Sequence, residues 1–235
     1  MLGPFSFEPS VLVALAVSGL LLAIEVARGE RPKLLEWADF VLFAVIATVG
    51  LLNLDWMNSW LSNHADEVSN ASLTLLAFGS LLAGRPFTAP YTEARFPDMD
   101  EGLAARLDRV ATVAWGVALG IAAVVGWYGE WVLKEPSNLW TAWVFQTVPL
   151  VVAFRSTIWF DRRTLCREAG EEPRPGRWAL ARDCCWWLIP TGIASLAFDG
   201  ASTAFSTCLI ATGIALTVGF HWLEISRGSH RAAVR

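Results

Sequence analysis

Residues 110–128 read VATVAWGVALGIAAVVGWY, nineteen consecutive residues without a charged side chain. An α-helix rises about 1.5 Å per residue, so this stretch is long enough to cross most of the ~30 Å hydrocarbon core of a bilayer. Backbone N–H and C=O groups need partners in lipid, and a helix supplies them internally. The stretch therefore predicts a membrane-spanning helix.

The composition of the whole chain agrees with a membrane protein. Of the 235 residues, 54% are hydrophobic and only 17% are charged, and the mean hydropathy is +0.45. A soluble domain carries about a quarter charged residues. The apolar residues fall in blocks that leave no polar segment long enough for a separate globular domain. We therefore expect a single all-α transmembrane domain over residues 1–235.

Outward from the central stretch, further apolar segments predict a polytopic bundle of seven helices, with six as the alternative. The predicted spans are about 10–27, 37–54, 68–84, 108–128, 139–160, 184–198 and 201–225. The third is the weakest, because only the fourteen residues 71–84 are free of charge. Asp199 and Gly200 predict a tight turn that makes the last two segments a helical hairpin.

The segments between the spans are expected to be connections. Residues 53–70 form a polar link, and residues 161–183 form a loop that is irregular through its Pro- and Gly-containing part at 171–176. Asp98 and Glu101 have the spacing of a helix N-cap, which predicts that the fourth helix begins before the membrane does. Gly116 and Gly120 form a G-x-x-x-G pair in that helix, which favours close packing either within the chain or between two copies.

Basic residues fix the predicted orientation. With the N-terminus outside and seven crossings, 17 of the 18 basic residues fall on the cytoplasmic side, and only Lys134 lies outside. Each added or lost helix would exchange the sides of every later loop, so this asymmetry supports the crossing number as well as the orientation. The C-terminus is then cytoplasmic. The cytoplasmic basic residues are Arg28, Arg31, Lys33, Arg85, Arg95, Arg106, Arg109, Arg155, Arg162, Arg163, Arg167, Arg174, Arg177, Arg182, Arg227, Arg231 and Arg235.

The loop at residues 84–109, GRPFTAPYTEARFPDMDEGLAARLDR, is the first candidate site. The Arg85 guanidinium could hold an anionic group such as a phosphate through two parallel hydrogen bonds, with hydroxyl contacts from Thr88 and Tyr91. The alternative is structural: Gly84 caps the third helix, Pro86 stops it, and Arg85 anchors the topology.

A second candidate site is formed by ionisable residues near the cytoplasmic ends of three spans. These residues are Glu25, Arg155, His221 and Glu224. In the functional interpretation they line a cytoplasm-facing polar pocket, where Arg155 pairs with Glu25 or Glu224 and His221 relays protons or binds ligand. In the structural interpretation the same side chains extend to the inner head-group region or form ion pairs that only stabilise the fold.

Other classes of function find little support in the sequence. No nucleophile and base pair, phosphate-binding loop or zinc-binding spacing is present, so we assign no catalytic residue, metal or cofactor and lean against an enzyme. The net charge of −4 gives no reason to expect nucleic acid. On the outer side, scattered polar residues offer only a weak cation site: Asn53, Asp55, His64, Asp66 and Glu67.

The sequence GRPFT, followed by Tyr91 and by RLDRVATVAWGVAL, resembles a group of bacterial integral membrane proteins that carry an Arg-Pro-Phe-Thr cytoplasmic loop. The resemblance covers residues 82–119 and implies a multi-pass protein of the bacterial inner membrane. The group has no established activity, so the resemblance transfers no site residue. This chain has Tyr91-Thr92-Glu93 where the group has Tyr-Ala-Arg-Glu.

Three functions follow as hypotheses. The first is a transporter-like or channel-like protein that binds a small anionic or lipid-like solute from the cytoplasmic side. The second is a non-catalytic accessory or assembly subunit of a membrane complex, and the third is a membrane enzyme acting on lipid head groups. The expected partners are the lipid bilayer, a small solute or lipid, and either a second copy of the chain or another membrane subunit.

Overall fold

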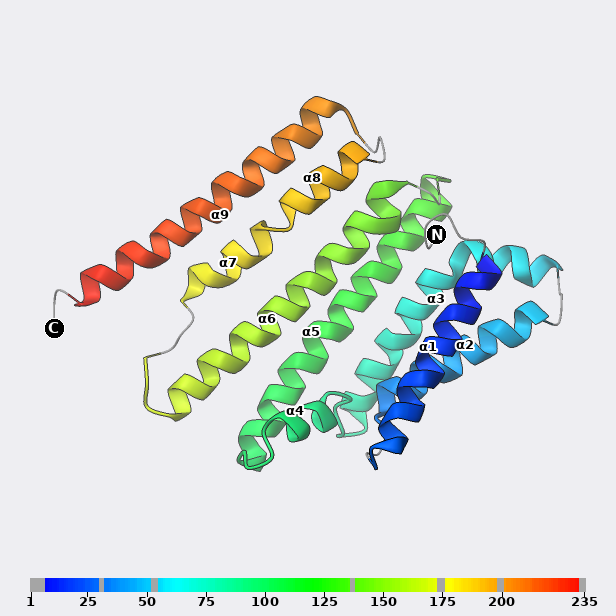
Figure 1. The fold of residues 1–235 in the computed structure, drawn as a ribbon, viewed down its shortest axis with the longest axis horizontal. Helices are drawn as coiled ribbons and strands as arrows, with labels where there is room; N and C mark the ends of the chain where they lie inside the picture. Colours follow the sequence, from blue (N-terminus) through cyan, green and yellow to red (C-terminus); the bar gives the residue numbers. More distant parts are fainter. Residues whose placement is uncertain are drawn as a thin grey trace. The chain divides into compact units, whose positions relative to one another are not determined.

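The computed structural model describes residues 7–29, 32–51, 55–135, 138–172, 176–197 and 201–232. Throughout these residues the regular structure is helical, which confirms the predicted all-α class. The chain divides into two compact units, Met1–Ser137 and Asn138–Arg235 (Figure 1).

In the described part of unit 1 there are four long α-helices, one short helix and a π-helical turn. They are α1 (Phe7–Ala27), α2 (Leu34–Leu51), α3 (Asp55–Leu82), α4 (Ala89–Arg95), α5 (Glu101–Trp127) and η1 (Tyr128–Val132). Helices α1 and α2 pack on each other around Val11, Ile46 and Ala47. Helix α3 begins at Asp55, so most of the predicted link at 53–70 is helical instead.

Helices α3 and α5 form an antiparallel pair in which small residues allow a close approach (Figure 1). A Cβ atom at Gly116 would lie 3.2 Å from the Ala77 Cβ and 3.1 Å from Phe78 Cζ, and one at Gly120 would lie 3.5 Å from Thr74 Cγ2. Four residues toward the C-terminus of α5 thus correspond to about one turn toward the N-terminus of α3. The predicted G-x-x-x-G pair therefore serves packing within the chain.

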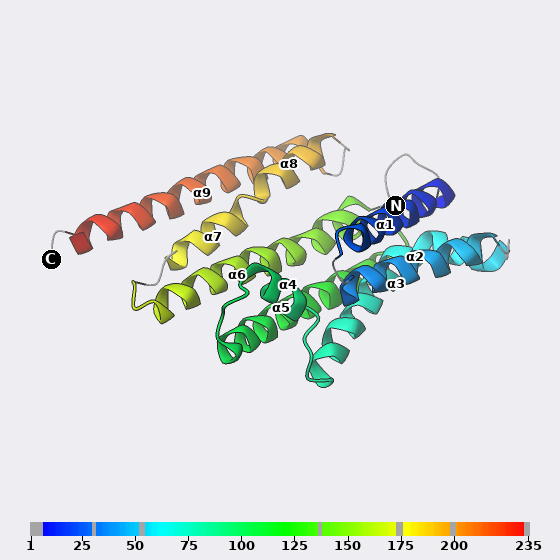
Figure 2. The same cartoon turned by 60° about the horizontal axis from the view of Figure 1, so that its bottom comes forward.

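Local hydrogen bonds explain where these two helices meet the connection between them. Gly84 has a φ of +71°, and the Arg85 N–H donates to the Ser80 carbonyl at 2.9 Å, which closes α3 with a Schellman motif. Helix α5 begins one residue after Asp100, whose carboxylate accepts from the Leu103 N–H at 3.0 Å. The prediction of Asp98 as the N-cap was therefore wrong by two residues. The short helix α4 of this connection lies beside α5 (Figure 2).

Unit 2 contains a long helix that starts with a π-helical turn, a broken helix, and a second long helix. These elements are η2 (Trp140–Val144), α6 (Phe145–Glu168), α7 (Arg177–Cys185), α8 (Leu188–Ala197) and α9 (Thr203–Ala232). Pro149 lies inside α6 and has no N–H, so it leaves the helix one hydrogen bond short. One turn earlier, the Gln146 side chain donates to the Thr141 carbonyl at 3.0 Å.

Helices α7 and α8 together run along α9, as Figure 1 shows in yellow beside orange and red. The chain turns at Trp186 and Trp187, just before Pro190, which cannot donate to a preceding carbonyl. The predicted hairpin is thus present as α8 and α9, although the predicted Asp199–Gly200 turn lies outside the described residues. Part of the predicted loop at 161–183 was wrong, because α6 continues to Glu168 and α7 begins at Arg177. Residues 173–175 of that loop also lie outside the described residues.

Glycine and serine make the α8–α9 contact unusually close. A Cβ atom at Gly192 would lie 2.6 Å from Ile210 Cγ1 and 2.8 Å from the Ser206 carbonyl oxygen. Nearby, the Ser206 hydroxyl donates to Ser195 Oγ at 2.9 Å, and both serines have no exposed surface. The two backbones therefore approach where side chains are smallest, as in other membrane helix pairs.

Three helical segments of the described chain are long and apolar enough to cross a membrane: Glu101–Val132, Trp140–Glu168 and Thr203–Glu224. A shorter apolar segment covers Val11–Ala27. Large apolar side chains also lie on the surface, including Leu75 (74% exposed), Val124 (68%) and Trp131 (70%). Such exposure suits lipid, because soluble proteins rarely keep extensive apolar surface in water.

Candidate functional site

The Arg-Pro-Phe-Thr loop of unit 1 is held against α3 and α5 by its own side chains. Phe87 is buried, and its N–H donates to Ser80 Oγ at 3.0 Å. The next residue, Thr88, has its hydroxyl 3.0 Å from the Asp108 carbonyl oxygen and 2.9 Å from Thr112 Oγ1. Asp108 and Thr112 are both buried. Thr88, predicted as a ligand contact, is therefore used to join the loop to α5.

Tyr91 belongs to a second contact of the same loop, which centres on Lys33. The Lys33 Nζ lies 3.7 Å from Glu25, 3.8 Å from Glu36 and 4.7 Å from the centroid of the Tyr91 ring. Burial, together with the carboxylates of Glu36 and Glu25, raises the pKa of Tyr91 well above its usual range. The phenol therefore stays protonated at neutral pH and donates a hydrogen bond to Glu36.

These contacts bring together two of the predicted site residues, Glu25 and Tyr91. Lys33, which joins them, was counted in the sequence only as a topology charge. Its i, i+3 spacing to Glu36 was the available signal. Arg85, the proposed anion ligand of the loop, is exposed, and the Gly84 cap predicted in the structural alternative is confirmed.

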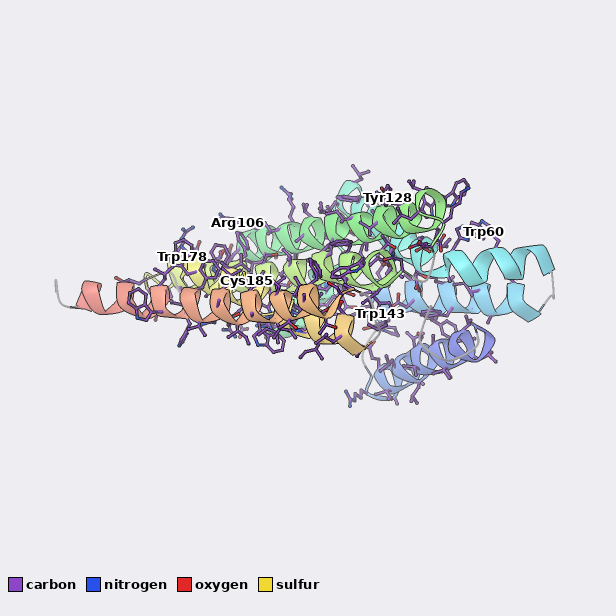
Figure 3. The ribbon with its side chains drawn as sticks, turned by 90° about the horizontal axis from the view of Figure 1, so that it is seen from above. Trp60, Arg106, Tyr128, Trp143, Trp178 and Cys185 are labelled. Atoms are coloured by element: carbon purple, nitrogen blue, oxygen red, sulfur yellow. The ribbon has the colours of Figure 1, made fainter. Side chains whose placement is uncertain are left out.

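In unit 2, His221 and Glu224 lie together on α9 and face Arg182 of α7. The Arg182 Nη1 lies 3.2 Å from Glu224 Oε2 and 3.4 Å from His221 Nδ1, and Nη2 lies 2.9 Å from Asp183 Oδ1. The basic partner of Glu224 is thus Arg182. Trp178 stacks on Phe220 one turn away, with ring centroids 5.5 Å apart. Figure 3 shows Trp178 and Cys185 on the segment that lies along α9.

Arg155 differs from the other predicted residues of unit 2. It is half-buried on α6, six residues before Asp161, the first charge of the polar end of that helix. Within residues 138–172, 176–197 and 201–232, no carboxylate lies within ion-pair distance of its guanidinium, whose Cζ atom lies 5.8 Å from the centroid of the Phe154 ring.

The chemistry of these groups is that of ion pairing and hydrogen bonding. Among the described residues, no group of three or more His, Cys, Asp or Glu side chains is placed to hold a metal ion. The clusters around Lys33 and Arg182 each pair a basic side chain with carboxylates of the chain itself. Among the predicted site residues that the structure describes in unit 2, Arg155 is a basic group whose five guanidinium donors are not used in an ion pair.

The fold and these clusters define an all-helical protein with helices suited to a membrane. Comparisons with known proteins found no matching protein family, no matching curated protein and no matching solved structure.

Proposed function

We propose that the chain is a seven-span protein of the bacterial inner membrane with an outside N-terminus and a cytoplasmic C-terminus. Each of the seven predicted spans overlaps a helix of the described residues, and three of these helices are long and apolar enough to cross a membrane. Of the 18 basic residues, 17 then lie on the cytoplasmic side. A reporter fused after residue 235 should be active only in the cytoplasm, and a periplasmic signal there would overturn this orientation.

We further propose that unit 2 binds a phosphate-bearing anion at Arg155 from the cytoplasmic side, as a transporter-like or channel-like protein would. One observation carries this proposal. Arg155 is half-buried within a candidate membrane-spanning helix, and its guanidinium has no carboxylate partner among the described residues of unit 2. An arginine at the centre of a membrane helix costs about 2.5–3.5 kcal/mol, and less toward its end. A bound anion would offset that cost.

Phosphate chemistry suits the position of Arg155. The residue lies about 9 Å along the helix axis from Asp161, at ~1.5 Å per residue, so its long side chain can reach the depth of the inner-leaflet phosphates. A planar guanidinium donates two parallel hydrogen bonds to two phosphate oxygens. The phosphate can belong to a lipid head group or to a free solute, and both present the same oxygens.

The other predicted residues fit this role less well. Thr88 is hydrogen-bonded to Asp108 of α5. Glu25 forms an ion pair with Lys33, and Glu224 forms one with Arg182. Releasing any of them for a ligand would cost an internal contact. These internal contacts also favour the second hypothesis, a non-catalytic accessory subunit, should no anion bind.

The test compares three variants of the full chain in neutral-lipid nanodiscs. Arg155→Gln removes the charge, Arg155→Lys keeps the charge but loses the bidentate geometry, and Arg85→Gln is the control at an exposed arginine. Binding of added phosphatidylglycerol is measured by native mass spectrometry, and binding of inorganic phosphate by equilibrium dialysis.

We expect Arg155→Gln to weaken binding of one ligand by tenfold or more, because a hydrogen-bonded charged contact contributes about 1.5–3 kcal/mol. Arg155→Lys should fall between wild type and Arg155→Gln, and Arg85→Gln should match wild type. Loss in the phosphatidylglycerol arm alone identifies a lipid site, and loss in the phosphate arm identifies a solute site. Equal binding by wild type and Arg155→Gln in both arms would reject the proposal and leave the accessory subunit.

A further inference from the structure

A third polar cluster joins α3 to the π-helical turn η1 in unit 1, at the opposite end of the α3–α5 pair from the Arg-Pro-Phe-Thr loop. His64 Nε2 lies 3.1 Å from Glu130 Oε2. The His64 ring stacks on Trp60, with centroids 4.7 Å apart and an interplanar angle of 8°. Figure 3 labels Trp60 on α3 and Tyr128, the first residue of η1. Glu130 was not among the residues selected from the sequence.

The hydrogen-bond geometry of His64 fixes where its protons must be. Its Nδ1 lies 2.7 Å from the Trp60 carbonyl oxygen, which can only accept, so Nδ1 carries a hydrogen. In neutral imidazole the other nitrogen, Nε2, then has a lone pair. At 3.1 Å that lone pair would face a carboxylate oxygen of Glu130 with no hydrogen between them. One further proton is therefore needed for this contact, carried either by Nε2 or by Glu130.

The contact between His64 and Glu130 is largely shielded from water, so the position of its proton affects the energy of the fold. The His64 and Glu130 side chains are only 14% and 9% exposed, so water contributes little to solvating either. Glu67, one turn along α3, is buried as well at 4% exposure. The charged groups of the described residues that face Glu130 are His64, Glu67 and Asp66.

The geometry points to a proton-binding site between His64 of α3 and Glu130 of η1, with Glu67 beside it. The proton comes from water when it binds and returns to water when it leaves, and no other bond changes. The π-helical geometry of η1 is common where helices carry function. This inference concerns unit 1 and does not depend on anion binding at Arg155.

Histidine-selective NMR of the full chain can test the site, because the sequence contains only three histidines. The ring nitrogens are labelled with 15N, and the His64 signals are assigned by their loss in His64→Gln. These signals are then compared at one neutral pH between wild type and Glu130→Gln. Glu93→Gln, an exposed carboxylate at the other end of the unit, is the matched control.

We expect the ring-nitrogen signals of His64, recorded at one neutral pH, to differ between wild type and Glu130→Gln, because the substitution removes the carboxylate that lies 3.1 Å from Nε2. Glu93→Gln should give the wild-type signals. Unchanged His64 signals in Glu130→Gln would overturn the inference. If Glu130→Gln does not fold, Glu67→Gln serves the same purpose: a smaller change of the His64 signals supports the site, and no change overturns it.

Discussion

Adding one methyl group at Gly192 should separate α8 from α9, and the structure allows the cost to be worked out. The new Cβ atom would lie 2.8 Å from the Ser206 carbonyl oxygen, a backbone atom that cannot rotate away. Part of α9 must therefore shift. Overpacking of this kind costs typically ~1–3 kcal/mol.

Gly219→Ala is the matched control on α9. Apart from its chain neighbours and the backbone of its own helix, no described atom lies within 4 Å of the Cβ atom that this substitution adds. Replacing a mid-helix glycine by alanine gains about 0.5–1 kcal/mol of helix stability, and both substitutions share that gain. The difference in free energy of unfolding between the two variants is then the overpacking cost alone, ~1–3 kcal/mol.

Equilibrium unfolding in mixed micelles with increasing sodium dodecyl sulfate measures that difference. Gly192→Ala should unfold at lower detergent fraction than wild type, and Gly219→Ala at an equal or higher fraction. Equal stability of the two alanine variants would refute the reasoning, because it would mean that α8 and α9 do not approach closely at Gly192.

Three further predictions follow from unit 1 and unit 2. In Tyr128→Phe, Tyr91 is the sole remaining tyrosine, and its tyrosinate absorbance should rise only well above pH ~10, the ordinary pKa, whereas the denatured chain should titrate normally. Because the folded-state pKa of Tyr91 is raised, its stabilising effect is complete below pH ~10 and falls as the pH rises further, so Tyr91→Phe should flatten the loss of unfolding free energy in alkali. Thr88→Val should destabilise the fold by about 1–3 kcal/mol in the detergent unfolding assay, since it leaves buried Asp108 and Thr112 without their hydroxyl partner, and a loss no larger than that of Arg85→Gln would contradict this. Arg182→Gln should cost only about 0–1 kcal/mol, because its ion pair with Glu224 is partly exposed, and a much larger loss would show that the pair is more buried than the structure indicates.

The helices were predictable because apolar blocks and local signals determine them. The charge-free residues 110–128 fall almost wholly within α5, and Gly84 caps α3 as its sequence context indicated. Boundaries were less predictable. Pro173, Pro175 and Gly176 suggested an irregular loop, yet α7 begins immediately after Gly176, so those residues precede a helix start.

The contacts of the site residues depend on helix register, which a single sequence does not reveal. Lys33 and Arg182 were visible as charges, but their pairing with Glu25 and Glu224 requires knowing which faces meet. Glu130 lies far from His64 in the sequence and reaches it only because α3 and α5 are antiparallel.

The close α8–α9 contact was missed for the same reason. Gly192 and Ser206 lie on different helices and form no motif in sequence. The hairpin brings them together, and its existence was predictable although its register was not. Local spacing could identify Gly116 and Gly120, whose four-residue separation places them on one face of a single helix.

The central claim is that Arg155 holds a phosphate-bearing anion, and an electron cryo-microscopy map of the full chain in nanodiscs containing phosphatidylglycerol tests it most directly. The account predicts density for a head-group phosphate or a free anion within hydrogen-bond distance of the Arg155 guanidinium, and its loss in Arg155→Gln. A guanidinium paired with a carboxylate of the chain, with no density beside it, would contradict the claim.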